Sequence, residues 1–193
     1  MVPKAYEGLW RRSAIRRSNG SSDLTTQVWW LQSSRYHIDL RIPLGRVGIT
    51  AFAGETVVDG DRCEWRPAIA YPALGDELDA GWMRFDDADH LHETGLDHSY
   101  EEDWYREPSG AMDGVRLQQA DGDAVAFLLI SDQWMAWACG NEFTVYRRDQ
   151  QWTAIASSIG AKEGCIVTLD LPLRSGETFE LPMAPGKFWR VSG

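Results

Sequence analysis

Apolar and polar residues alternate along most of this chain, and the period of the alternation is two. The clearest stretch is 36–42, where apolar side chains beginning with Tyr36 interleave with His37, Asp39 and Arg41. Successive side chains of a β-strand point to opposite faces, so this stretch predicts a strand with one apolar and one polar face. A helical period is almost absent from the chain, and we expect nearly no helix.

Turn signals separate the alternating stretches at intervals of about ten residues. The pair Asp59-Gly60, for example, supplies the positive φ that a tight hairpin turn requires. About sixteen short strands result, half of them before the turn-rich stretch 107–110 and half after it. Because one large barrel would need about ten longer strands, we predict an all-β antiparallel meander of two small barrels packed together. The expected units are an N-terminal barrel at 1–108 and a C-terminal barrel-like lobe at 109–193.

Composition and charge add to this picture. The 193 residues include ten Trp, six Tyr and six Phe, and such rings suit strands and line pockets. The formal net charge of −10 is localised in an acidic belt at 76–107, which contains twelve acidic residues and two arginines. We interpret the acidic belt as solvated surface or, alternatively, as a face for a basic protein partner. It argues against nucleic acid as a partner, since phosphate binding needs positive faces.

The cysteines and the apolar runs indicate the compartment. Cys63, Cys139 and Cys165 are odd in number and form no CxxC motif, which favours a reducing compartment over a disulfide framework. The segment 1–7 lacks the apolar core of a signal peptide, and the longest apolar run, 124–130, is far too short to span a membrane. We therefore expect a soluble cytoplasmic protein without a membrane partner.

The tripeptide Gly8-Leu9-Trp10 opens the first predicted strand. A Gly-x-Trp on the first strand, with an arginine from a late strand closing over the indole, is the signature of the calycin superfamily of lipocalins and fatty-acid-binding proteins. This chain resembles that pattern, with Arg106 or Arg190 as the arginine. The resemblance implies a calycin-like barrel whose base is pinned by a buried Trp10.

A wider set of segments is similar to a calycin-like family of double β-barrels. The named member of this family is a yeast protein that interacts with a casein-kinase-type protein kinase. The similarity covers about residues 6–106, and it extends to the second half in strand count alone. Because the family has no established activity, the resemblance implies a fold and no catalytic residues. The segments that carry it are 30–32, 36–43, 52–56, 63–66, 91–95 and 100–104.

Binding residues are expected inside the first barrel. Asp39 and Arg41 share a strand face with His37; such a cluster could hold a carboxylate or phosphate, fix the strand register, or form a solvent-facing polar row. Aromatic side chains are the expected walls, although part of them serves as barrel filling. The predicted ligand-binding residues are Trp30, Tyr36, Asp39, Arg41, Trp65, Glu93 and Trp104.

No metal site and no cofactor are predicted. His90 and His92 share a strand face among acidic residues, but their spacing matches no established metal motif, and no histidine follows His98. The chain also has no nucleophile elbow, no phosphate-binding loop and no dinucleotide fingerprint.

We therefore predict non-catalytic binding of a small apolar or amphipathic ligand. Two alternatives stay open. One is a protein-interaction module with filled barrels that uses the acidic belt. The other is a cofactor-free barrel enzyme, a lyase or hydrolase, in which Glu93 or Glu101 acts with His92.

Overall fold

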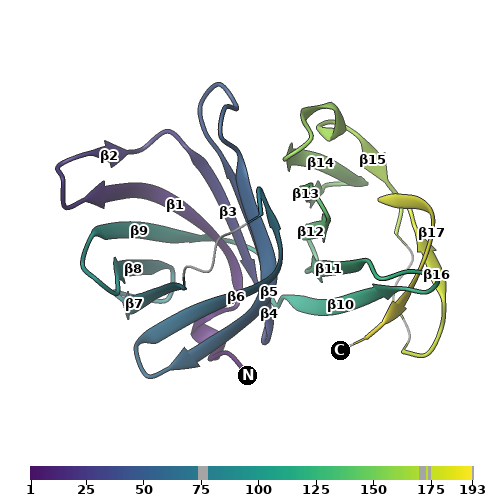
Figure 1. Cartoon of the computed structure of the whole chain (residues 1–193), viewed down its shortest axis with the longest axis horizontal. Helices are drawn as coiled ribbons and strands as arrows, with labels where there is room; N and C mark the ends of the chain where they lie inside the picture. Colours follow the sequence, from purple (N-terminus) through teal and green to yellow (C-terminus); the bar gives the residue numbers. More distant parts are fainter. Residues whose placement is uncertain (74–77, 170–172, 174, 193) are drawn as a thin grey trace.

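The structure, a computed structural model, describes residues 1–73, 78–169, 173 and 175–192, and it is built almost entirely of antiparallel strands (Figure 1). The strands form two sheets that follow one another along the chain. The elements of the first lobe are the 3-10 helix η1 (Lys4–Tyr6) and the strands β1 (Gly8–Arg17), β2 (Ser22–Asp23), β3 (Gln27–Gln32), β4 (Tyr36–Ile42), β5 (Thr50–Asp59), β6 (Arg62–Tyr71), β7 (Asp79–Phe85), β8 (His90–Gly95) and β9 (Tyr100–Glu107). Those of the second lobe are β10 (Asp113–Gln119), β11 (Val125–Ile130), β12 (Trp134–Cys139), β13 (Glu142–Arg148), β14 (Trp152–Ser157), the 3-10 helix η2 (Gly160–Lys162), β15 (Ile166–Val167), β16 (Phe179–Leu181) and β17 (Ala184–Val191).

The first sheet closes into an eight-stranded barrel. Its strands follow the order β1-β3-β4-β5-β6-β7-β8-β9, and β9 pairs with β1 to complete the circle. The two-residue strand β2 pairs with the far end of β1. Closure removes the unpaired edges that an open sheet would present to other chains. This up-and-down barrel is the architecture predicted for the first half.

The second sheet is curled but open. Its order is β15-β14-β13-β12-β11-β10-β17-β16, and in the described part of this lobe the two edge strands do not pair with each other. These edge strands contain two and three residues, too few to form a continuous ladder across the gap. The predicted all-β pair of lobes is confirmed, with the difference that the second lobe is a half-barrel.

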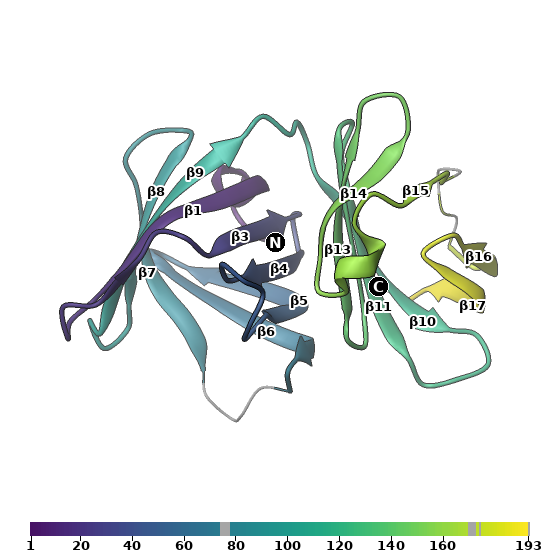
Figure 2. The same cartoon turned by 90° about the horizontal axis from the view of Figure 1, so that it is seen from above.

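The lobes pack through the outer face of the first barrel, as the view in Figure 2 shows. The apolar row of β4, from Tyr36 to Ile42, points out of the barrel and joins one buried cluster with β11, β12 and β13. Within this cluster the ring of Tyr36 lies 5.4 Å from that of Phe127, and Trp29 lies 5.9 Å from Trp134. The polar row of β4 therefore points into the barrel.

Trp10 is packed at one end of the barrel and links β1 to neighbouring segments there. Its side chain is fully buried, and its Nε1 donates to the carbonyl oxygen of Tyr6 at 2.8 Å. The guanidinium of Arg106, the residue opposite Trp10 across β1 and β9, lies 4.5 Å from the centroid of the indole. The calycin-like contact expected at this position is confirmed, with Arg106 and not Arg190 as the arginine.

The helix η1 closes the same end. The ring of Tyr6 packs edge-on against Phe85 at 4.9 Å. The chain then turns into β1 at Gly8, whose φ of +127° is one that side-chain-bearing residues rarely adopt. A Cβ at Gly8 would also lie 3.0 Å from the Oγ of Ser109. The positive φ and the close approach of Ser109 thus both require a glycine at position 8 of the Gly-x-Trp segment.

We expect Trp10→Ala to lower the free energy of unfolding by about 3–5 kcal/mol, because it leaves a cavity beneath Arg106. Trp82→Ala is the matched control, since Trp82 is 44% exposed on the outer surface, and it should cost less than about 1 kcal/mol. Urea unfolding followed by circular dichroism measures both. A Trp10→Ala protein as stable as the wild type would contradict this role.

Candidate functional site

An aromatic layer fills the interior of the first barrel next to its closed end. The ring of Trp30 lies 5.5 Å from those of both Trp65 and Trp104, and 6.1 Å from that of Trp10. All of these side chains are buried. Trp30 therefore contacts both of the other predicted wall tryptophans, although the three residues are far apart in the sequence.

A charged layer lies beyond the aromatic layer. Arg12 follows Trp10 by two residues along β1 and donates to the Oε1 of Glu102 on β9 at 2.5 Å. On β4, the Nε of Arg41 donates to the Oδ1 of Asp39 at 2.7 Å. The side chains of Arg12, Glu102 and Asp39 are 6% exposed or less, so the barrel encloses the pair of Arg12 with Glu102 and the acidic member of the other pair.

Glu93 on β8 connects the two layers. Its carboxyl group accepts hydrogen bonds from the Oη of Tyr100 at 2.8 Å and the Nε1 of Trp104 at 3.2 Å. Gly81 leaves room for this side chain, because a Cβ there would lie 2.8 Å from the Cγ of Glu93. Burial, together with the nearby charge of Glu102, raises the pKa of Glu93 to about 8. Glu93 is therefore largely protonated at neutral pH.

Burial raises the pKa of the other interior acids as well. This holds for Asp39, Asp79 and Glu102, although the guanidinium of Arg41 acts in the opposite direction on all three. Asp79 faces inward opposite Trp65 across β6 and β7, and it accepts no hydrogen bond from any described residue. The interior thus holds more carboxyl groups than guanidinium groups.

The charged layer is reached from the end of the barrel opposite η1. Arg41 is the last inward residue of β4, and its side chain is 30% exposed, whereas that of Asp39 is 4% exposed. Asp79 begins β7 at the same end and is half-buried. We call this end, marked by Arg41 and Asp79, the mouth of the barrel.

His37 shares the inward face of β4 but belongs to a separate neutral network. Its Nδ1 lies 3.0 Å from the Oγ1 of Thr56, which in turn donates to the Oε1 of Gln32 at 2.8 Å. Complete burial lowers the pKa of His37 to about 3, so the ring is uncharged at neutral pH. These bonds link β3, β4 and β5 and add no charge to the interior.

The predicted binding residues lie in this interior with one exception. Tyr36 is on the outer face of the barrel, because it belongs to the apolar row of β4 that packs on the second lobe. The same register excludes the solvent-facing polar row that the alternation also allowed. The predicted residues that point inward are Trp30, Asp39, Arg41, Trp65, Glu93 and Trp104.

The list of predicted binding residues omitted Arg12, Asp79 and Glu102. A signal existed for two of them, since Arg12 is two residues after Trp10 and Glu102 is two residues before Trp104. Residues two apart on a strand share a face, so a buried tryptophan marks its neighbours as inward. Asp79 stands at the first position of its strand and has no such local pattern.

The structure divides the acidic belt between the interior and the surface. Glu93 and Glu102 point inward, whereas His92 is on the outer face of β8, with its Nδ1 2.9 Å from Asp103. The enzyme alternative grouped Glu93 or Glu101 with His92. Glu93 faces away from His92, because adjacent strand residues face opposite sides, whereas Glu101 and His92 both border one hollow on the outer face. Within the described ranges, no group of three or more His, Cys, Asp or Glu side chains is arranged to hold a metal ion.

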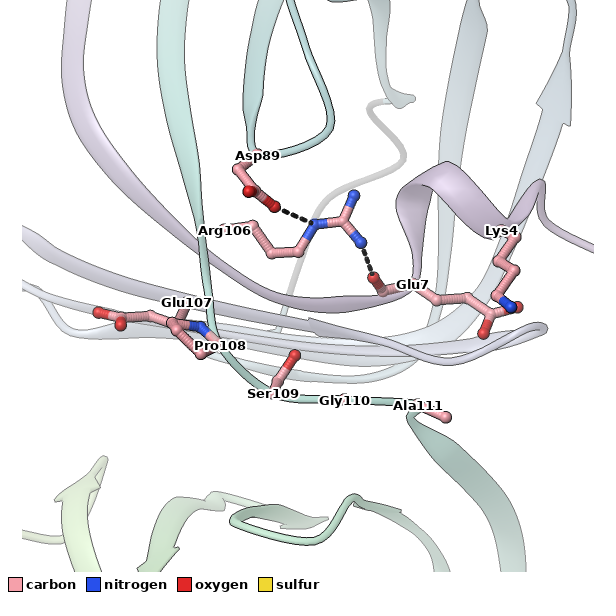
Figure 3. A pocket seen from close by; sticks show the side chains of 9 residues that line it. All are labelled: Lys4, Glu7, Asp89, Arg106, Glu107, Pro108, Ser109, Gly110 and Ala111. Atoms are coloured by element: carbon pink, nitrogen blue, oxygen red, sulfur yellow. Dashed lines mark hydrogen bonds and ion pairs between the residues drawn. The ribbon is translucent and has the colours of Figure 1, made fainter.

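A hollow of about 450 Å³ lies outside the barrel, beside the segment that joins the lobes (Figure 3). Figure 3 shows Arg106 within it, bonded to the carbonyl oxygen of Glu7 and facing Asp89. This guanidinium already donates to three backbone carbonyl groups and stacks on Trp10. We therefore assign the hollow to the packing of the barrel base. Its lining residues are Lys4, Glu7, Asp89, Arg106, Glu107, Pro108, Ser109, Gly110 and Ala111.

Comparison with known proteins shows the fold. No protein-family model and no curated protein sequence matches this chain. Among solved structures, an uncharacterised protein of Saccharomyces cerevisiae, YLR301w, superimposes with a TM-score of 0.69 at 15% identity, over 96% of this chain and 97% of the other. A lipocalin-like protein of Bacteroides uniformis gives a TM-score of 0.42 at 11% identity, over 53% of this chain and 99% of the other. The first likeness covers both lobes, so this chain shares its two-lobed fold with the yeast protein.

None of the helices in the described residues is both long and apolar enough to cross a bilayer.

We expect the free energy of unfolding to fall as the pH rises from about 4.5 to about 8, by up to about 1.4 kcal/mol per pH unit. Over this range the folded protein keeps the proton of Glu93, whose ordinary pKa is 4.5, while the unfolded chain loses it. Glu93→Gln cannot ionise, so its stability relative to the wild type should grow with pH. Glu101→Gln, on the outer face, is the control. Urea unfolding between about pH 5 and 8 measures this, and parallel profiles for Glu93→Gln and wild type would contradict it.

Proposed function

We propose that the first barrel binds a small amphipathic ligand through its mouth. The observation that carries this proposal is the charged layer placed next to the aromatic layer inside a closed barrel. Buried charges destabilise a protein unless they are well paired. In this interior, Asp79 accepts no hydrogen bond from a described residue. Small-ligand sites typically combine apolar walls with a few polar groups that fix orientation. The barrel interior contains both components.

The aromatic layer supports the apolar part of such a ligand. Trp65 and Trp104 flank Trp30 and present large, rigid rings to the interior. Phe52 extends this wall toward the mouth, since its ring lies 5.1 Å from the guanidinium of Arg41. A ligand that enters past Arg41 would meet polar groups first and rings beneath them.

Asp39, Arg41 and Glu93 are proposed to orient the polar part. Asp39 and Arg41 form an ion pair near the mouth, and Glu93 stands at the boundary between the two layers through its bond from Trp104. This placement supports the roles predicted for these three residues. Tyr36 is not part of the proposed site, because it packs between the lobes.

A protein partner is a second candidate, and the outer face of β7, β8 and β9 favours it. Trp82 is 44% exposed there and borders a hollow of about 910 Å³ that also includes Asp61 and Glu101. An exposed indole beside carboxylates suits a basic protein surface. A casein-kinase-type protein kinase, implied by the family resemblance, is one partner to test on this face.

Native mass spectrometry tests the ligand proposal. Protein purified without denaturant should carry a small molecule that raises its mass above 21.8 kDa and is released on unfolding. Asp39→Asn keeps the shape of the side chain and removes its charge, so we expect it to bind this compound about tenfold more weakly. Glu55→Gln is the matched control, because Glu55 pairs with Arg35 on the outer face.

Two results would contradict the proposal. One is undiminished binding of the compound by Asp39→Asn. The other is a protein that keeps the mass of the chain alone, both as purified and after incubation with a panel of amphipathic metabolites.

A further inference from the structure

We infer that the second lobe binds a small apolar molecule with a carbonyl oxygen, in a hollow beside the apolar core on its concave face. This site is separate from the interior of the first barrel, so the inference does not depend on the proposed function. Three observations carry it: the exposed margin of the core, the hollow beside that margin, and two buried indole N–H groups without an acceptor.

The apolar core of the second lobe is exposed along its margin. The core consists of inward side chains of the curled sheet, among them Leu117, Leu128 and Trp137. In the described residues, ten apolar side chains at its margin are only partly buried, against three at the margin of each of the other two cores. The open sheet accounts for this difference, since the edge strands β15 and β16 do not pair in the part of the lobe that is described. Such a margin is stabilised when an apolar molecule covers it.

A hollow of about 430 Å³ lies at this margin. Its volume is in the range of pockets that bind small molecules, about 300–1,000 Å³. Most of its lining side chains are aliphatic and belong to the core or pack against it, so the hollow selects an apolar molecule. These side chains are Val115, Leu128, Ile130 and Leu173.

Trp137 is the neighbour of the residues that line the hollow. Val115 is opposite Leu128 across β10 and β11, and Leu128 is opposite Trp137 across β11 and β12. Opposed side chains on one face of antiparallel strands have Cβ atoms about 4.5–5.5 Å apart. The row that begins in the hollow with Val115 and Leu128 therefore continues directly to the indole of Trp137.

Trp189 meets Trp137 across the concave face. Their strands, β17 and β12, are separated by β10 and β11 in the order of the sheet, yet the two rings lie 5.5 Å apart. The curl of the second sheet, visible in Figure 1, brings the two strands to face each other. Both side chains are fully buried. The two indoles thus stand together beside the hollow.

Neither indole N–H group has an acceptor. The Nε1 atoms of Trp137 and Trp189 are buried and have no hydrogen-bond partner among the described residues. The rings are nearly perpendicular, at 85°, so one indole N–H can point at the face of the other ring, but both cannot do so at once. At least one buried donor is therefore unpaired, and an acceptor supplied by a ligand would remove this destabilisation.

A carbonyl oxygen is the acceptor that fits these surroundings. It offers two lone pairs and brings no donor of its own. A hydroxyl group would bring a donor into an aliphatic hollow, and a carboxylate would bring a charge without a counter-ion. The ligand class is accordingly an apolar ketone or ester.

Two pairs of isosteric compounds test this inference. Acetophenone and α-methylstyrene differ in the exchange of a carbonyl oxygen for a methylene group, and so do cyclohexanone and methylenecyclohexane. In proton–nitrogen correlation spectra of the full chain, at least one ketone should move the indole signal of Trp137 or Trp189 to higher proton frequency, because that N–H becomes a donor. The matching alkene should not produce this shift. Trp137→Phe and Trp189→Phe assign the two signals.

Variants measure the contribution of the donor and of the hollow. The ratio of ketone affinity to alkene affinity should fall about tenfold in Trp137→Phe or Trp189→Phe, because phenylalanine keeps a ring and lacks the N–H group. Val115→Phe fills the hollow and should weaken binding of both compounds about tenfold or more. Ile155→Phe is the matched control, since Ile155 is 36% exposed in the same lobe and should leave both affinities unchanged. Thermal melts by circular dichroism identify any variant that fails to fold, and the spectra of the wild type give a reading that needs no variant.

Three results would overturn the inference. One is the absence of a ketone-specific shift at both indole signals with all four compounds. Another is a ratio of ketone to alkene affinity that is the same in the wild type and in both tryptophan variants. The third is a dimer in analytical ultracentrifugation that Val115→Phe dissociates, because a second copy of the chain would then cover the hollow.

Discussion

The apolar contact between the outer face of the first barrel and the second sheet is the constraint on which the candidate site depends. Strand side chains alternate between two faces. A barrel strand whose apolar row packs against the second lobe must therefore point its polar row into the barrel. This is the situation of β4, where Ile38 and Leu40 pack between the lobes while Asp39 and Arg41 enter the barrel. The packing of two lobes thus creates a charged interior in the first one.

The barrel tolerates this interior because its charges are partly paired. The bonds between Arg12 and Glu102, and between Arg41 and Asp39, offset the cost of taking these groups out of water. Glu93 reduces the cost differently, by remaining protonated between Tyr100 and Trp104. Asp79, at the first position of β7, lies at the mouth and is half-buried. The stability of the barrel therefore depends on the charge balance of its interior.

Likeness to the yeast protein extends over both lobes, yet only 15% of the aligned residues are identical. A shared fold at this distance establishes the architecture, and function has to be argued from the site. The contact between Trp10 and Arg106 belongs to the architecture, since it fixes the closed end of the barrel. The charged layer near the mouth is the part of this chain on which the proposed function rests.

Short-range chemistry accounts for the local structure: the alternation of β4, the glycine turns between strands and the Gly-x-Trp opening of β1 could all be predicted from the amino-acid sequence. The sequence also identified tryptophans and charges that meet inside the first barrel. Packing between distant parts of the chain determines which face of β4 lies inside. This packing places Tyr36 at the lobe interface and brings Glu102 to Arg12. It also decided that the second lobe stays open in the described residues. A period of two separates the two faces of a strand but does not predict what packs on each face. Contacts between residues distant in the chain determine this packing.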